Sequence, residues 1–208
     1  MQVYRCHIIK HTLLSAGLIL GLHGFGFAQT SYEARPESKV WIEGSSTVHD
    51  FDCKSDTIGG RAEVPKIAAK DTVSGTAGPE IEIEFPVKSF DCGRSRMNRD
   101  FYEALNADDH EAITFDFTGA RKLETDSNNN SESYDKYEVA GKLTVSGVTR
   151  EVLVQVKGLP KEDGAIRIFG AKKISMKDFD IEPPTALMGM VRVHEELIVH
   201  FDLLVESK

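Results

Sequence analysis

Residues 44–53 read GSSTVHDFDC and combine hydroxyl, imidazole, carboxylate and thiol groups in one short stretch. Such side chains form nucleophilic sites, which need a base within hydrogen-bonding distance of the nucleophile and donors for an oxyanion. In an extended strand, His49 and Asp50 point to opposite faces, so the carboxylate cannot orient the imidazole. Cys53 lies about 13 Å from His49 along such a strand, too far for activation of its thiol. The spacing argues against a catalytic centre, and we predict no catalytic residue.

Metal sites commonly use closely spaced ligand pairs, such as the two histidines of His-Glu-x-x-His. The histidines at positions 49, 110, 194 and 200 show no such spacing, and Cys53 and Cys92 lie far apart in the chain. We therefore predict no metal ligand. Two interpretations remain for Ser46, Thr47 and His49: polar residues at a strand end, or the rim of a pocket, where they bind a polar head group.

The stretch belongs to a chain in which apolar and polar residues alternate with period two, as is typical of antiparallel sheet with one apolar face. In the clearest run, Leu197, Val199 and Phe201 alternate with polar residues such as His200 and Asp202. The candidate strands cover 39–43, 47–53, 57–64, 81–87, 113–117, 137–145, 149–157, 165–175 and 197–205. Roughly eight or nine short strands without alternating helices predict an all-β barrel or sandwich.

One short helix interrupts the strands. Met97, Phe101 and Leu105 recur at helical spacing and form an apolar face. Ser95 or Asn98 is a suitable residue to cap the start of this helix. An amphipathic helix inserted between barrel strands must bury its apolar face, and we expect it to cover an open end of the barrel.

The inward positions of the strands decide whether the barrel is solid or hollow. A closed barrel of about eight strands is just wide enough to be filled by side chains or to hold one narrow ligand. The inward residues mix large aromatic rings with Gly141, which leaves both a packed core and an apolar channel open. No charged residue falls on the inward side of the strongest strands, so the occupant of any cavity is expected to be apolar. Burying each methylene group contributes about 0.8 kcal/mol, which favours a long hydrocarbon chain.

The N-terminal residues resemble a secretory leader. Arg5 and Lys10 precede the apolar run LLSAGLILGLHGFGFA, and Gly26-Phe27-Ala28 supplies the small residues of a cleavage site. We expect a signal peptide at 1–28, cleaved before Gln29, with a membrane anchor as the alternative. A flexible segment at 29–38 and a single domain at 39–208 would follow. The protein is then periplasmic or secreted, without stable membrane insertion after cleavage.

The charge of the remaining chain restricts its partners. Loss of the leader removes two basic residues and changes the net charge from −8 to −10. So acidic a protein is repelled by phosphate backbones and anionic surfaces. We therefore expect no nucleic-acid partner.

Two cysteines remain after cleavage. An even number in an exported domain favours a disulfide between Cys53 and Cys92, with two separate buried thiols as the alternative. Closing a loop of about 40 residues contributes about 4 kcal/mol in the chain-entropy model.

Three segments resemble the YceI-like family of secreted bacterial proteins. They are EGSSTVHDFDC at 43–53, IEFPVKSFDCGRSRMNRDFYEALNADDHEAITFDF at 83–117 and VAGKLTVSGVTREVLVQVKG at 139–158. The similarity extends from Lys39 to the end of the chain, and the G-x-LT-x-x-G-V-T hairpin is its most specific motif. The resemblance implies an extended, antiparallel, eight-stranded lipocalin-like barrel with one short amphipathic helix. In this family the apolar pocket binds isoprenoid lipids, including polyprenyl chains and isoprenoid quinones.

The resemblance also implies which residues bind the ligand. The inward strand residues are Phe85, Val87, Phe115, Phe117, Val139, Leu143, Leu197, Val199 and Phe201, and the lid-like helix supplies Met97, Phe101 and Leu105. Many members begin with Asp-x-x-His-Ser, whereas this chain has Glu43-Gly44-Ser45-Ser46 and its histidine, His49, comes later. The resemblance implies no cofactor besides the bound lipid or quinone, and it leaves a homodimer open.

The resulting hypothesis is an exported protein that binds a long isoprenoid lipid for storage, transport or presentation and is not an enzyme. One alternative is an enzyme that acts on a lipid or a quinone. The other is a structural or adhesion domain with a filled core.

Overall fold

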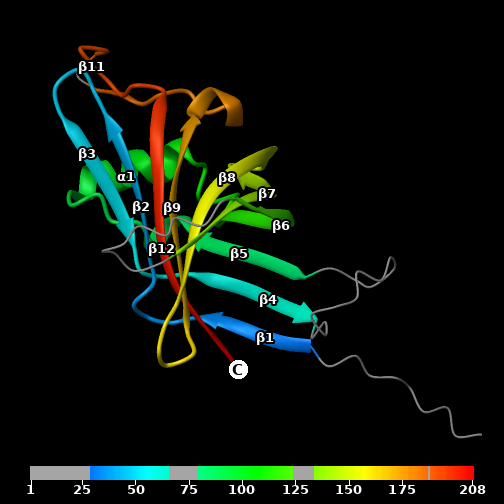
Figure 1. Ribbon diagram of the computed structural model, residues 1–208. Coiled ribbons are helices and arrows are strands. Elements are labelled where there is room, and N and C mark those ends of the chain that lie inside the picture. The colour runs from blue at the N-terminus through cyan, green and yellow to red at the C-terminus, as the bar shows by residue number, and fades with distance from the viewer. Residues whose placement is uncertain (1–28, 66–78, 124–133, 187) are drawn as a thin grey trace, which may run out of the picture.

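The computed structural model describes residues 29–65, 79–123, 134–186 and 188–208 (Figure 1). The main sheet contains β1 (Gln29–Ala34), β2 (Lys39–Ser45), β3 (Asp50–Ser55), β4 (Gly59–Pro65), β5 (Glu80–Pro86), β6 (Ala112–Lys122), β7 (Asp135–Val145), β8 (Val148–Pro160), β9 (Ile166–Ser175) and β12 (Glu196–Ser207). The remaining elements are η1 (Val87–Ser89), α1 (Ser95–Ala104), η2 (Met176–Phe179), β10 (Thr185–Ala186) and β11 (Val191–Arg192). The predicted leader, 1–28, lies outside the described residues, so its cleavage stays a prediction.

The main sheet closes on itself. Its strand order is β1-β4-β5-β6-β7-β8-β9-β12-β2-β3, and β12 also pairs with β1. All of these pairs are antiparallel, so β1, β4 to β9 and β12 form the predicted closed barrel of eight strands. The hairpin of β2 and β3 continues the sheet from the first half of the same edge of β12 (Figure 1).

A buried serine lies between β1 and β2, where the strand paired with β12 changes from one to the other. β12 pairs with β2 from Ile198 to Asp202 and with β1 from Val205 to Ser207. Between these pairings the Ser38 hydroxyl, which is 1 % exposed, accepts a hydrogen bond from the Leu204 N–H at 3.0 Å. Ser38 therefore satisfies a backbone group where the regular pairing is interrupted.

The structure differs from the flexible segment expected at 29–38. Residues 29–34 form β1, which pairs with β4 and β12. Arg35 then binds Asp163 and Glu206, each at 2.6 Å. QTSYEA has little apolar alternation, so its strand depends on backbone pairing with distant parts of the chain, which local pattern does not reveal.

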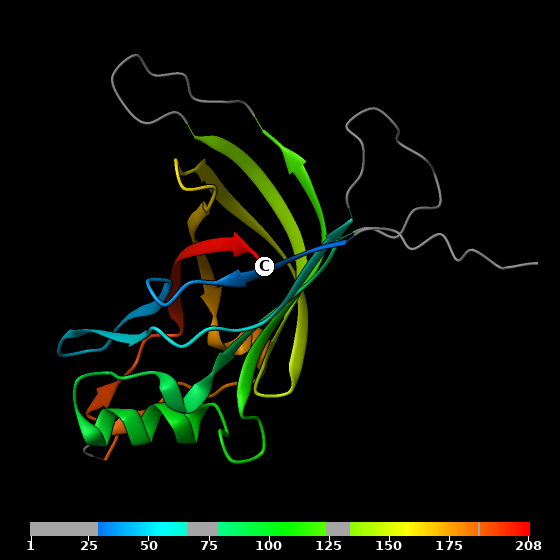
Figure 2. The same ribbon diagram turned by 90° about the horizontal axis from the view of Figure 1, so that it is seen from below.

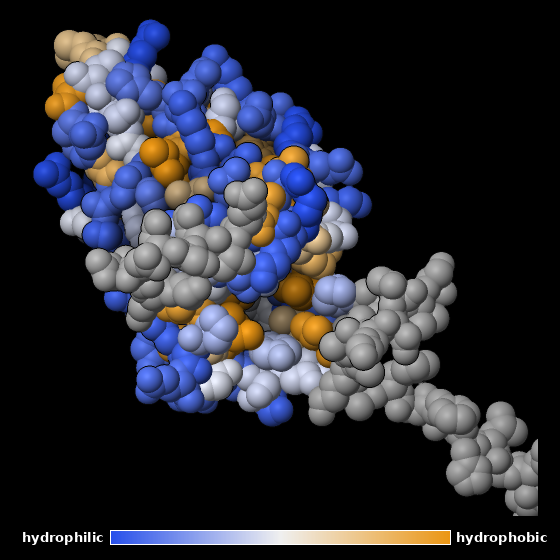
Figure 3. All heavy atoms as spheres, viewed as in Figure 1, coloured by the Kyte–Doolittle hydropathy of each residue, from blue (hydrophilic) through white to orange (hydrophobic). Residues whose placement is uncertain are grey.

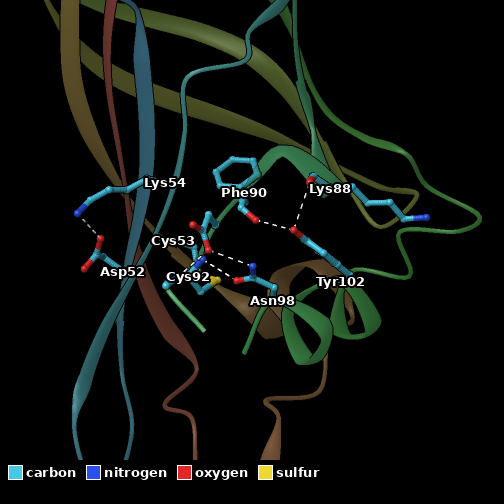
Figure 4. Close-up of a disulfide and its surroundings, with 10 residues drawn as sticks. Asp52, Cys53, Lys54, Lys88, Phe90, Cys92, Asn98 and Tyr102 are labelled. Carbon is cyan, nitrogen blue, oxygen red and sulfur yellow. Dashed lines mark hydrogen bonds and ion pairs between the residues drawn. A yellow bond between two sulfur atoms is a disulfide. The ribbon is translucent and has the colours of Figure 1, made fainter. Parts of the chain in front are cut away.

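A seam separates β3 from β5, because β3 and β4 split what would otherwise be one strand. Among the described strands, β3 pairs only with β2, whereas β4 pairs with β1 and β5. Lys54 and Asp91 cross the seam with two backbone hydrogen bonds of 2.9 and 2.8 Å. The adjacent disulfide joins Cys53 to Cys92 and confirms the predicted pairing (Figure 4).

The predicted helix is α1, which lies beside the β2–β3 hairpin (Figure 2). Phe101 packs against the apolar clusters at this end of the barrel, as its helical spacing predicted. The expected cap is wrong, because Arg94 precedes the helix and no side chain caps it. The side-chain amide oxygen Oδ1 of Asn98 instead accepts a hydrogen bond from the Cys92 N–H at 2.7 Å (Figure 4). The side chain thus stabilises the loop that carries the disulfide.

Candidate functional site

The barrel encloses a cavity of about 770 Å³. Isoleucine, valine, leucine and phenylalanine side chains from β2, β3, β5 to β9, β12 and α1 form most of its wall. Figure 3 shows hydrophobic atoms recessed between hydrophilic ones on one side of the barrel. At the tip of the β2–β3 hairpin, Val48 lines the cavity and is 62 % exposed, so the apolar wall reaches the surface there. The interior is therefore hollow and accessible rather than filled.

All but one of the predicted ligand-binding residues line this cavity. They are Phe85, Phe115, Phe117, Val139, Leu143, Leu197, Val199 and Phe201 from the strands, Met97, Phe101 and Leu105 from the helix region, and His49 from the β2–β3 turn. Period-two and helical spacing thus placed them on the correct faces.

Val87 is the exception, and its predicted place in the cavity wall is wrong. The strand ends at Pro86, and Val87 begins the short helix η1. Its side chain is 1 % exposed and belongs to a packed cluster with Leu105, Ala107 and Val145. The local alternation continues through Val87, but the proline ends the strand just before it.

Glycines in the wall make room for aromatic rings. A Cβ atom at Gly141 would lie 2.2 Å from Cζ of Phe115, and one at Gly170 would lie 2.8 Å from Cζ of Phe201. The rings therefore lie close against the sheet. Small residues keep the cavity open indirectly, because they let large neighbours lie flat along the wall.

A few charged residues also line the cavity. Arg94, Arg96 and Asp100 come from the start of α1, Asp135 from β7 and Lys172 from β9. The apolar pattern of the strongest strands did not reveal Lys172. The signal was nevertheless present, because it shares the parity of Ile168 and Ile174, which also line the cavity.

The hydroxyl-rich turn between β2 and β3 serves mainly to hold the hairpins in place. The Ser46 hydroxyl donates to the His49 carbonyl at 2.8 Å and accepts from the His49 N–H at 3.2 Å. The Thr47 N–H donates to the Arg192 carbonyl at 2.9 Å, which joins this turn to β11. Of the turn residues considered for a pocket rim, Ser46 and His49 line the cavity and Thr47 does not.

Within the described residues, one serine hydroxyl contacts a histidine ring, and neither residue lines the cavity. Ser45 Oγ lies 2.8 Å from His194 Nδ1. No carboxylate is hydrogen-bonded to His194 in the described part of the chain, so the orienting group of a nucleophilic triad is missing there. The contact joins the β2–β3 hairpin to the segment before β12.

Neither metal ligands nor a spanning helix occur in the ranges that the structure covers. No group of three histidine, cysteine, aspartate or glutamate side chains within those ranges is arranged to hold a metal ion. No helix there is both long enough and apolar enough to cross a bilayer.

The family model for the YceI-like domain matches residues 36–205, which is most of the chain and all of the barrel except β1 and the end of β12. The chain belongs to the YceI-like family. The match confirms the resemblance carried by the three sequence segments. None of the curated proteins matches the sequence significantly.

Solved structures share the YceI-like fold at low sequence identity. BcnA of Burkholderia cenocepacia is 19 % identical with a TM-score of 0.61, over 84 % of this chain and 99 % of its own. A polyisoprenoid binding domain from Saccharophagus degradans, implicated in plant cell wall breakdown, is 13 % identical with a TM-score of 0.61, over 88 % and 99 % of the two chains. The YceI protein of Campylobacter jejuni is 13 % identical with a TM-score of 0.52, over 75 % and 84 %.

Proposed function

We propose that this YceI-like protein is an exported carrier that holds one long isoprenoid lipid inside its barrel. The observation that carries the proposal is the apolar cavity of about 770 Å³. This volume lies in the range of about 300–1,000 Å³ typical of pockets for small molecules and cofactors. The hollow interior disagrees with the alternative of a structural domain with a filled core.

The composition of the wall favours a hydrocarbon over a polar metabolite. Each buried methylene group contributes about 0.8 kcal/mol, whereas a polar ligand needs hydrogen-bonding partners to offset its desolvation. Along the strands the wall offers side chains such as Phe115, Val139 and Val199, which have no hydrogen-bonding groups. The S. degradans relative, described as a polyisoprenoid binding domain, supports an isoprenoid as the class of hydrocarbon.

In this proposal α1 and the apolar wall residues bind the lipid tail by van der Waals contact. Met97 and Phe101 of α1 cover the hydrocarbon chain of the lipid, and the flexible thioether of Met97 adapts to the shape of the lipid. His49 lies at the exposed rim, where it contacts the head group. Neither a cofactor nor a catalytic residue is required, and the protein stores, transports or presents its ligand unchanged.

The disulfide and the leader pattern support export. Disulfides persist in oxidising compartments and are rare in the cytosol. Cys53 and Cys92 are joined across the seam, and both side chains are buried. The periplasm or the extracellular space is therefore the proposed location.

Native mass spectrometry tests the proposal. The delipidated protein, offered a polyprenol or an isoprenoid quinone in detergent, should gain the mass of one lipid. Val139→Trp should abolish uptake by filling the cavity, whereas Ala140→Trp, on the other face of β7, should retain it. Absence of uptake by the folded wild-type protein would refute a carrier, and turnover of the lipid would favour an enzyme.

A further inference from the structure

Lys172 is a cation set into an otherwise apolar part of the cavity wall. It lies in β9 on the same side as Ile168 and Ile174, and all three line the cavity. Its cross-strand neighbour in β12 is Val199, which also lines the cavity. Lys172 is partly buried, unlike its exposed neighbour Lys173.

The ammonium group has no partner within the described ranges. No hydrogen bond or ion pair joins Lys172 to another described residue. The next residue, Lys173, points to the outer face and binds Glu196 at 2.7 Å. The two consecutive lysines of β9 therefore differ in charge compensation. Glu196 neutralises the outer one, whereas no described residue neutralises the inner one.

The acidic residues of the cavity are already occupied by other cations. Asp100 lies 3.7 Å from Arg96, and Asp135 lies 2.9 Å from Lys122. Lys172 thus adds an uncompensated positive charge to the cavity wall. An anionic group that enters the cavity and reaches this ammonium group would form a charge-assisted hydrogen bond, which is stronger than a neutral one.

We propose that Lys172 binds the anionic head group of the ligand, and that the ligand class is an isoprenoid lipid ending in a phosphate or pyrophosphate. The inference rests on the proposed lipid-binding function and adds to it the chemistry of the head group. A lysine binds phosphate as a compact point charge with several donors. From Lys172 the apolar wall continues along β9 through Ile168 to Ile166, which provides a surface for the lipid tail. A neutral polyprenol or a quinone would leave the charge without a counterion.

Equilibrium binding to the delipidated mature protein tests the head-group assignment. A polyprenyl phosphate and the polyprenol of the same chain length should each displace a fluorescent apolar probe, and the phosphate should bind about tenfold more tightly. Lys172→Met should abolish this preference and leave the polyprenol affinity within about twofold. Lys173→Met removes the same charge from the outer face and should keep the preference. Lys172→Arg should also keep it, and this variant tests the charge if the methionine variant fails to fold.

Each other outcome has a distinct meaning. Equal binding of the two lipids by the wild-type protein would overturn the assignment while leaving the carrier function intact. A preference that survives in folded Lys172→Met would overturn it as well, since the charge would then act from another residue such as Arg94. Displacement of the lipid phosphate by millimolar inorganic phosphate would assign the site to a free anion and overturn the lipid head group. If neither lipid binds, the proposed function itself fails.

Discussion

The ring of Phe115 in β6 lies directly against Gly141 in β7, so closely that a Cβ atom on the glycine would meet Cζ at 2.2 Å. Phe115 lines the cavity, and its position against the sheet depends on the missing side chain opposite. The width of the cavity at this point therefore depends on Gly141, although this glycine has no side chain that could contact a ligand.

Gly141→Val should narrow the cavity. The valine side chain displaces the Phe115 ring inward, which should lower lipid affinity at least tenfold and destabilise the fold by about 1–3 kcal/mol. Lipid titration and urea unfolding measure the two effects. Gly119→Ala serves as the control, because no atom lies within 4 Å of the added Cβ and its effect should be small. Unchanged lipid affinity in Gly141→Val would show that the ring does not limit the cavity.

Removal of the disulfide should destabilise the seam between β3 and β5. Cys53 and Cys92 are separated by 39 positions, and a loop of this size corresponds to about 4 kcal/mol, with about 2–4 kcal/mol typical of measured disulfides. The double variant Cys53→Ala, Cys92→Ala should lose stability in this range on urea unfolding. A reducing agent should destabilise the wild-type protein equally and leave the double variant unaffected. Equal stability of the two proteins without reductant would contradict the structural role.

Tyr102 connects α1 to the loop that carries the disulfide. Its hydroxyl donates to the Phe90 carbonyl at 2.7 Å, with the Lys88 carbonyl at 3.2 Å (Figure 4). Tyr102→Phe should therefore cost about 1 kcal/mol of unfolding free energy, because a partly buried carbonyl loses its donor. Thermal unfolding measures the loss. Tyr32→Phe is a suitable control, since no hydrogen bond of the Tyr32 hydroxyl occurs within the described residues.

Acid should weaken the barrel through Asp202. Arg167 binds its carboxylate with two hydrogen bonds of 2.7 and 2.6 Å, and this contact lowers the pKa of Asp202 below its ordinary value of 3.8. A carboxylate with a lowered pKa in the folded state stabilises the protein above its unfolded pKa. That contribution is lost as the pH falls from near 4 through the lowered pKa.

Urea unfolding at neutral pH and between about pH 5 and 2 tests the role of this pair. Asp202→Asn should lower stability at neutral pH by about 1 kcal/mol and should flatten the acid dependence. Arg61→Gln removes the charge of an exposed arginine in β4 and should leave that dependence unchanged. An acid profile that is identical in Asp202→Asn and the wild type would contradict the assignment.

The architecture could largely be predicted from the sequence. Successive side chains of a barrel strand point alternately inward and outward, and apolar and polar residues alternate in the sequence with the same period of two. Runs such as 137–145 and 197–205 predicted both the strands and their inward faces. Residues such as Phe117 and Leu197 consequently line the cavity as expected. Helical spacing likewise placed Phe101 on the face of α1 that packs against the barrel.

The features that were missed depend on contacts distant in sequence or on isolated exceptions to a pattern. β1 forms because β4 and β12 pair with it, and its own residues carry little apolar alternation. Asn98 binds the loop before the helix rather than capping it, a choice that depends on the path of the chain around Cys92. Lys172 shares the parity of Ile168 and Ile174, but a single charged residue among apolar ones in β9 was not recognised as part of the inward face.

The pairing of β12 with both β1 and β2 has a consequence for how the protein is made. Tyr32 pairs with Ser207, which closes the barrel, and Trp41 pairs with His200, which attaches the β2–β3 hairpin, so both contacts join segments very far apart in sequence. Such contacts form slowly, because a long loop must close before they contribute. A chain that leaves the ribosome, or a translocation channel, with its N-terminus first therefore stays open along this edge until β12 has emerged.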